Sequence, residues 1–346
     1  MNTQVTSSSS ASSSKPRGVL AVLLVGAALA PLVGGNQYLL SIAVMTLLYA
    51  YLALSWNILG GIAGQLSLGH AAYFGIGAYT STWLFVNLGW SPWFGMWVGA
   101  ALAMVAAVIV GLSCMHLRGA YFALATIATA MVLKTLVENA DALLGGPRGM
   151  EVTLLRDAPL QFQHTRKEFY YVVALVFTAA ALLVNRAILR SRFGYYLAAV
   201  RNDQDAALAL GVPVMRYKLA AAMLSAGLTA IGGTFYAQLV LYISPDKVFG
   251  ANLGVVIAVV CIIGGRGTLW GPLVGALLLL PGEELARALS GGMVGVDMML
   301  YGLLLMLVIR WEPRGLWALW LGWRERRSST RATDAARRAG MKEATR

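Results

Sequence analysis

Polar side chains and glycines interrupt the apolar sequence in one stretch, residues 64–80. A lipid-facing segment of this composition would be penalised in hydrocarbon. Buried inside a helix bundle, it could present backbone N–H groups and hydroxyls at mid-membrane depth, as discontinuous helices do around a polar solute. A glycine-mediated packing seam with incidental polar side chains would have the same composition, so both interpretations stay open. The candidate path residues are Gly64, Gln65, Ser67, Gly69, His70, Tyr73 and Gly75.

The sequence offers few residues suited to catalysis, proton transfer or metal binding. His70 has no acidic residue near it in the same segment, so a hydrogen-bonding role is a simpler interpretation than proton transfer. Acidic residues are scarce within the apolar runs, which argues against a transporter coupled to protons or sodium. The sequence shows no nucleophile, base or metal-ligand cluster at ligand-like spacing. We therefore expect no catalytic residue and no metal site.

The second informative segment, residues 198–213, lies in a polar connection. Asn202 or Asp203 can cap a short helix, Asp205 suits its positive end, and Gly211 can stop it. A helix of about two turns is marginal alone in water, so its Ala and Leu face should dock on the membrane surface or on a cytoplasmic partner. The candidate residues for this contact are Arg201, Asn202, Asp203, Ala206, Ala207 and Gly211.

These two segments must be positioned by membrane-spanning helices. The chain is 58% hydrophobic and 12% charged, and apolar runs follow one another. We predict an all-α fold, a polytopic membrane helix bundle of about ten transmembrane helices with broken or re-entrant segments. The predicted spans are 18–33, 38–57, 62–85, 93–114, 119–137, 169–189, 217–242, 250–264, 271–287 and 295–311.

Charge sets the expected orientation and organisation. The formal net charge of +12 lies largely in tails and short loops, which is the positive-inside pattern and not a nucleic-acid footprint. We expect a disordered basic leader at 1–17, a transmembrane domain at 18–316 with a cytoplasmic loop at 190–217, and a basic cytoplasmic tail at 317–346 beside membrane lipid. Both termini are expected in the cytoplasm.

The ordered motifs resemble one family, the membrane permeases of branched-chain amino acid ABC importers, and within it the M-type subunit. The resemblance covers roughly residues 38–316. It rests on 64–71 (GQLSLGHA), 117–126 (LRGAYFALAT), 199–203 (AVRND), 264–272 (GGRGTLWGP) and 310–316 (RWEPRGL).

The resemblance implies a bacterial inner-membrane heterodimer of two related permeases, with two cytoplasmic ATPase subunits and a periplasmic substrate-binding protein. It also implies that the loop around Arg201 to Gly211 is the coupling helix held by an ATPase subunit. The phosphate-binding P-loop pattern is absent from this sequence, so ATP is expected on the partner subunits and no cofactor on this chain.

Alternatives remain at this stage. Permeases for urea or short amides have similar motifs, so the substrate is less certain than the family. A secondary transporter or channel, from a different class, would also be apolar, glycine-rich and basic inside. A membrane enzyme would need a reactive constellation that the sequence does not show.

Overall fold

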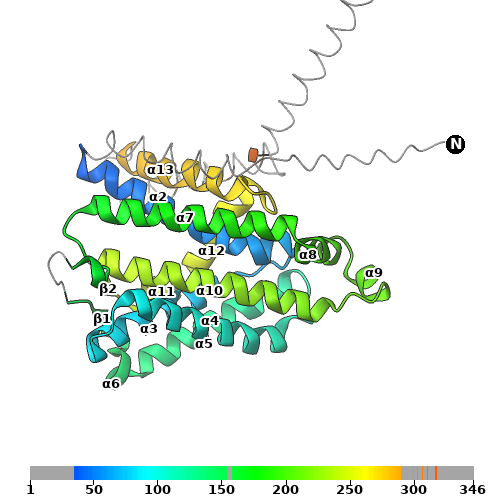
Figure 1. Ribbon diagram of the computed structural model, residues 1–346, viewed down its shortest axis with the longest axis horizontal. Helices are drawn as coiled ribbons and strands as arrows, with labels where there is room; N and C mark the ends of the chain where they lie inside the picture. Colours follow the sequence, from blue (N-terminus) through cyan, green and yellow to red (C-terminus); the bar gives the residue numbers. More distant parts are fainter. Residues whose placement is uncertain are drawn as a thin grey trace, which may run out of the picture.

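The computed structural model describes residues 35–153 and 158–289, together with positions 299, 302, 306, 310, 316 and 317. Long helices run side by side in a bundle (Figure 1). The long helices are α2 (Gln37–Trp56), α3 (His70–Leu88), α4 (Pro92–Cys114), α5 (Ala120–Asn139), α7 (Lys167–Arg190), α10 (Val214–Val240), α12 (Ala251–Gly265) and α13 (Gly271–Leu289). The short helices are η1 (Asn57–Ile62, a π-helix), α6 (Asp141–Leu144), η2 (Gly146–Arg148), η3 (Pro159–Gln161), α8 (Arg192–Asn202), α9 (Gln204–Ala209) and α11 (Pro245–Phe249).

The two ends of the bundle carry different elements. At one end α8 and α9 extend away from the long helices as an arm, residues 192–211, and we call this the arm end (Figure 1). The opposite, hairpin end carries α6 and the antiparallel pair β1 (Met150–Glu151) and β2 (Tyr242–Ile243), in which Met150 pairs with Ile243.

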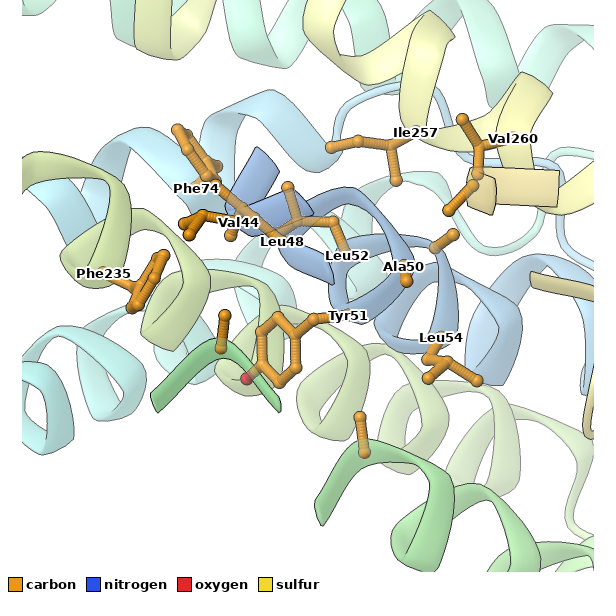
Figure 2. Packing of buried hydrophobic residues seen from close by; sticks show 14 of the residues in the cluster. Val44, Leu48, Ala50, Tyr51, Leu52, Leu54, Phe74, Phe235, Ile257 and Val260 are labelled. Carbon is orange, nitrogen blue, oxygen red and sulfur yellow. The ribbon is translucent and has the colours of Figure 1, made fainter. Parts of the chain in front are cut away.

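Helix α2 lies in the middle of the packing. Its apolar side chains meet residues of α3, α10 and α12 in one buried cluster, which Figure 2 shows around Leu48 and Leu52. The Tyr51 hydroxyl donates to the Leu228 carbonyl of α10 at 2.6 Å, so a polar group inside this apolar core is also satisfied.

Glycines allow the closest helix contacts. A methyl group at Gly77 of α3 would collide with the Ala230 carbonyl of α10, and one at Gly275 of α13 would collide with the Val260 carbonyl of α12. The close approach of these helix pairs therefore depends on glycine.

Burial differs strongly among the long helices. In the most apolar windows, 67% of α10 is buried inside the structure, against 28% of α4 and 28% of α5. Helices α4 and α5 expose large apolar side chains such as Val105, Ile109 and Leu136. Such faces suit lipid or another apolar partner better than water.

The predicted spans agree largely with the helices. Among the described residues, six helices are long and apolar enough to cross a membrane, and the chain is a multi-pass membrane protein. Helices α3 and α13 also coincide with predicted spans but do not belong to those six. Apart from single positions, the leader 1–17, the predicted spans 18–33 and 295–311 and the tail 317–346 lie outside the described residues.

The predicted span 62–85 contains a broken segment of the kind expected there. Residues 63–69 are not helical, and α3 begins only at His70. Gly64 has a φ of +73°, a left-handed conformation that ends the helical path after Ile62. We call residues 57–69, the π-helix with this non-helical segment, the break.

Candidate functional site

The break begins where α2 becomes a π-helix at Asn57. Just before this point, side chains of two other helices bind the α2 carbonyls. The Leu54 carbonyl accepts from Asn185 Nδ2 at 3.0 Å, and the Ser55 carbonyl accepts from the Ser225 hydroxyl at 2.7 Å. Single π-turns inside α-helices occur frequently at functional sites. This one is stabilised by hydrogen bonds from α7 and α10.

The Asn57 side chain is the centre of a buried hydrogen-bond network. Its Nδ2 donates to Asn185 Oδ1 at 3.1 Å and to the Thr268 carbonyl at 3.0 Å. Its Oδ1 accepts from the Gly267 N–H at 2.7 Å, and the Cys261 thiol lies 3.5 Å from the same oxygen. One amide therefore joins the break to α7 and to the turn between α12 and α13.

After Ile62 the chain turns back into the bundle. Trp56 Nε1 donates to the Ser67 carbonyl at 2.6 Å, and the Leu68 N–H donates to Thr126 Oγ1 at 3.1 Å. Helix α3 then starts at the buried His70, away from either end of the bundle. The geometry is that of a discontinuous helix, with an N-terminus inside the packing.

His70 is held as a hydrogen-bond donor. Its Nε2 lies 2.7 Å from Ser225 Oγ, and the single Ser225 hydroxyl proton is directed to the Ser55 carbonyl. Ser225 Oγ must therefore accept from a proton on His70 Nε2. Within the described part of the chain, His70 Nδ1 and Ser67 Oγ are buried and have no hydrogen-bond partner.

The arm follows the predicted capping pattern. The Asp203 carboxylate accepts from the N–H groups of Asp205 at 2.9 Å and Ala206 at 3.0 Å, so it caps α9. Gly211 follows the helix with a φ of +82°, in the left-handed region that suits glycine at a helix end. The short helix expected around 203–210 is therefore confirmed.

Two cations hold the arm against the bundle. Arg118, before α5, makes two hydrogen bonds to the Asp205 carboxylate at 3.0 and 2.7 Å. The Arg118 guanidinium holds the pKa of the Asp205 carboxyl below its ordinary value, and the carboxylate raises the pKa of Arg118. The buried Lys218 of α10 donates to Gln204 Oε1 at 2.7 Å.

Comparison with known proteins assigns the chain to a family. Residues 38–309 match the family model described as the permease component of branched-chain amino acid transport systems. The chain belongs to this family. This permease is 29% identical over 297 residues to the high-affinity branched-chain amino acid transport system permease protein LivM of Escherichia coli strain K12, covering 80% of this chain and 69% of LivM.

Two further relatives are more distant. The permease is 24% identical over 255 residues to LivH of the same strain, covering 69% of this chain and 82% of LivH. It is 25% identical over 279 residues to the nucleoside ABC transporter permease protein NupC of Lactococcus lactis subsp. cremoris, covering 74% of this chain and 84% of NupC. These relatives are permeases and not enzymes. No solved structure matches the chain.

The structure divides the predicted path residues of the permease into two groups. Gly64 is exposed and Gln65 half-buried near the arm end. A methyl group at Gly69 would collide with the Thr126 carbonyl, and one at Gly75 would collide with the Phe249 ring, so these two glycines are needed for packing. The buried group consists of Ser67, Gly69, His70, Tyr73 and Gly75.

The predicted coupling residues of the permease point in different directions. Ala206 is exposed, whereas Ala207 is buried against Val200 and Val214 in a small core inside the arm. Asn202 and Gly211 are exposed, and Asp203 is used as the α9 cap. Arg201 turns toward the break, where its Nη1 donates to the Gly61 carbonyl at 3.0 Å.

The sequence interpretation missed the residues that support the break. Asn57 and Asn185 lie at the ends of predicted apolar spans, and Ser225 lies within one. A polar amide in an apolar span must find a hydrogen-bond partner in the bundle. The presence of asparagines in such spans therefore indicated a buried polar network. Which residues pair could not be read from the sequence, since Asn57 and Asn185 are 128 positions apart.

The cysteines and histidines of the permease show no metal-binding arrangement. Cys261 is buried beside Asn57, and Cys114 is partly buried. Across the described ranges 35–153 and 158–289, no group of three or more His, Cys, Asp or Glu side chains could hold a metal ion.

Proposed function

We propose that this chain is one of two paired permeases of an ATP-driven importer for branched-chain amino acids in the bacterial inner membrane. The family match over residues 38–309 carries the proposal, because the family is described as a permease component for these substrates. LivM and LivH are both named permease proteins of a branched-chain amino acid system, and the chain is similar to both. A second, related permease is therefore the expected partner.

The orientation of the bundle is the second part of the proposal. Arg118, Arg201 and Lys218 all lie at the arm end, and the α12–α13 turn with Arg266 meets Arg201 there. Basic residues on one side mark the cytoplasm. The arm end is cytoplasmic, the hairpin end faces the periplasm, and about ten spans leave both termini inside.

The arm is the docking site for a cytoplasmic ATPase subunit. Helix α9 exposes Ala206 and Leu208, and Leu210, which follows it, is 84% exposed. Burying one leucine side chain is worth about 1.5–3 kcal/mol, so a partner groove that covers this surface would gain binding energy. ATP is bound by that partner and no cofactor by this chain, because the sequence has no P-loop pattern.

The break forms part of the translocation path. The unpaired Ser67 hydroxyl and His70 Nδ1 lie beside the N-terminus of α3, where free N–H groups favour a carboxylate. Both side chains are buried in this conformation, so the path requires a movement that opens the break. Such movement fits alternating access, in which one part of a transporter rocks against another.

The substrate is the least constrained part of the proposal. Similarity to a nucleoside permease indicates that related chains serve chemically different solutes. Urea or short amides are the second candidate, and a secondary transporter or channel is the candidate from another class. A periplasmic binding protein that delivers the substrate would supply most of the selectivity.

Uptake of radiolabelled leucine tests the proposal directly. The assay uses proteoliposomes with this chain, its neighbouring permease and ATPases, and with binding protein and ATP on their proper sides. ATP-dependent leucine accumulation is the expected result. Uptake of urea but not of leucine would replace the substrate, and leucine flux that is independent of ATP would contradict the ABC assignment.

The docking role of the arm predicts the effect of Ala206→Glu. This exposed position should accept the charge without unfolding the arm, whereas the partner groove should reject it. We expect the ATPase subunits to be lost from the purified complex and uptake to fall by at least about tenfold, the equivalent of 1.4 kcal/mol. Full retention of the ATPases would contradict the docking assignment. Ala207→Glu is not equivalent, because Ala207 lies in the core of the arm itself.

A further inference from the structure

Arg201 connects the arm to the break. It lies in the last turn of α8, two residues before the Asp203 cap of α9. Its Nη1 donates to the carbonyl of Gly61, which belongs to the π-helix. The side chain therefore bridges the element proposed to dock the ATPase and the element proposed to open the path.

Glycines form the notch that receives this side chain. The notch is defined by Gly61, Gly64 and Gly267. A methyl group on Gly64 would lie 2.5 Å from Arg201 Cγ, and one on Gly267 would collide with Arg201 Nη1. Gly64 and Gly267 also have φ values of +73° and +75°, which any other residue adopts with strain. Both the space and the backbone shape of the notch depend on glycine.

The notch is continuous with the buried network of the break. The Gly267 N–H donates to Asn57 Oδ1 at 2.7 Å, and Asn57 in turn bonds Asn185. At the last residues of a helix, carbonyl groups lack intrahelical partners, and a cation there is favoured by the helix dipole. The guanidinium thus meets the end of the α2–η1 helix where a positive charge is stabilised.

The other anchors of the arm do not reach this place. The Arg118–Asp205 pair joins α9 to the segment before α5, and Lys218 joins it to α10. These contacts set the position of α9, but neither of them touches residues 57–69. Through the end of α8, a displacement of α9 reaches the break at the Arg201–Gly61 hydrogen bond.

We propose that Arg201 is a positioning residue that transmits movement of the arm to the break, and not a residue that binds the ATPase. This inference rests on the proposed function, because it needs an ATPase docked on the arm. It separates two roles within the loop: Ala206 belongs to the docking surface, and Arg201 belongs to the internal linkage.

The test uses the complete transporter with Arg201→Ala in this chain. Removing the side chain empties the notch without introducing a clash, so the complex should assemble with its ATPases at wild-type stoichiometry. Uptake should fall by at least about tenfold, as expected for losing a hydrogen bond from a charged group. ATP hydrolysis should persist but lose its stimulation by substrate-loaded binding protein.

Amide hydrogen exchange distinguishes transmission of movement from a purely structural role of Arg201. In the wild type, ATP should change amide exchange in both 202–211 and 57–69. In Arg201→Ala only 202–211 should respond. Arg216→Ala, at an exposed arginine near the arm, is the matched control for loss of charge and should keep both responses.

A variant on the other side of the contact strengthens the test. Gly267→Ala lies outside the arm and crowds the guanidinium, so it should give the same uncoupling if it assembles. Loss of the ATPases in Arg201→Ala, or a continued ATP response of 57–69 in that variant, would overturn the linkage alone. A wild-type complex in which ATP leaves 202–211 unchanged would overturn the proposed function together with the linkage.

Discussion

The two ends of the bundle are held together by different physical means. At the hairpin end, the buried Phe162 stacks on Trp93 with ring centroids 4.0 Å apart and also contacts Phe177 and Phe235. At the arm end, hydrogen bonds and close glycine approaches surround Asn57, next to an apolar cluster that contains Ile58 and Leu197. The dispersion energy between packed rings falls as the rings separate and is regained only in close packing. A hydrogen bond, by contrast, can exchange one partner for another during a movement.

The difference between the two ends indicates which of them changes conformation during transport. The backbone of Phe162 has a φ of +59°, which is uncommon for a bulky residue, and the surrounding rings hold it there. At the arm end, the left-handed residues of the break and its neighbouring turn are glycines, Gly64 and Gly267, beside a π-turn, and glycines adopt this conformation without the strain of a bulky residue. We expect the hairpin end to act as the fixed support and the arm end as the part that changes.

The largest effect is expected from Phe162→Ala. Deleting a buried aromatic ring costs about 3–5 kcal/mol. The midpoint temperature of thermal unfolding in detergent should fall markedly, while Phe94→Ala, at a ring that is 55% exposed, should change it little. Equal midpoints for the two variants would show that the aromatic cluster does not support the hairpin end.

A smaller effect on stability and a larger one on transport are expected from Asn57→Ala. The change removes the acceptor of the Gly267 N–H and the Asn57 donor to Asn185 Oδ1, at about 1–3 kcal/mol for each unsatisfied group. Uptake should fall more than the unfolding temperature would suggest, because the break loses its link to the α12–α13 turn.

The control for Asn57 is Asn87→Ala, at an exposed asparagine that donates only to its own helix at the Trp83 carbonyl. Transport and thermal unfolding are measured for both variants. If uptake by Asn57→Ala falls only in proportion to the loss of folded protein, the Asn57 network has a structural role and no separate role in the movement of the break.

The smallest effect is expected from Asp205→Asn. The Arg118–Asp205 pair is exposed and screened by salt, so its removal should shift unfolding slightly and only at low ionic strength. Because the pKa of Asp205 is depressed in the folded protein, the contribution is present above its ordinary pKa and is lost as the pH falls through the depressed one.

The pH dependence checks the sign of that effect. The unfolding temperatures of wild type and Asp205→Asn should differ at neutral pH and converge in strong acid, below the depressed pKa of Asp205. A difference that grows on acidification would contradict the assignment of the pair as a clamp on the arm.

The sequence predicted the long helices because each is an apolar run of span length. The predicted 93–114 and 250–264, for example, nearly coincide with α4 and α12. It also predicted the α9 cap, since capping depends on Asp203 and its immediate neighbours.

The details that depend on distant contacts could not be predicted in this way. The break starts at Asn57 because Asn185 and Ser225, far along the chain, bind the α2 carbonyls just before it. The orientations of Ala206 and Ala207 also escaped prediction, because a helix of 6 residues is too short for periodicity to define a face. Phe162 lies in a polar loop, where burial is not expected from composition.

The distant supports of the break impose an order on biosynthesis. The carbonyls of Leu54 and Ser55 leave the ribosome long before their partners, which are 131 and 170 residues further along the chain. The Leu54 carbonyl lacks its side-chain donor until α7 has been made, and the Ser55 carbonyl lacks Ser225 until α10 has been made, within lipid where unsatisfied backbone is costly. The nascent α2 should therefore insert as an ordinary helix and acquire its π-turn only after α10 has docked. A truncated chain that ends before residue 214 is expected to insert without it.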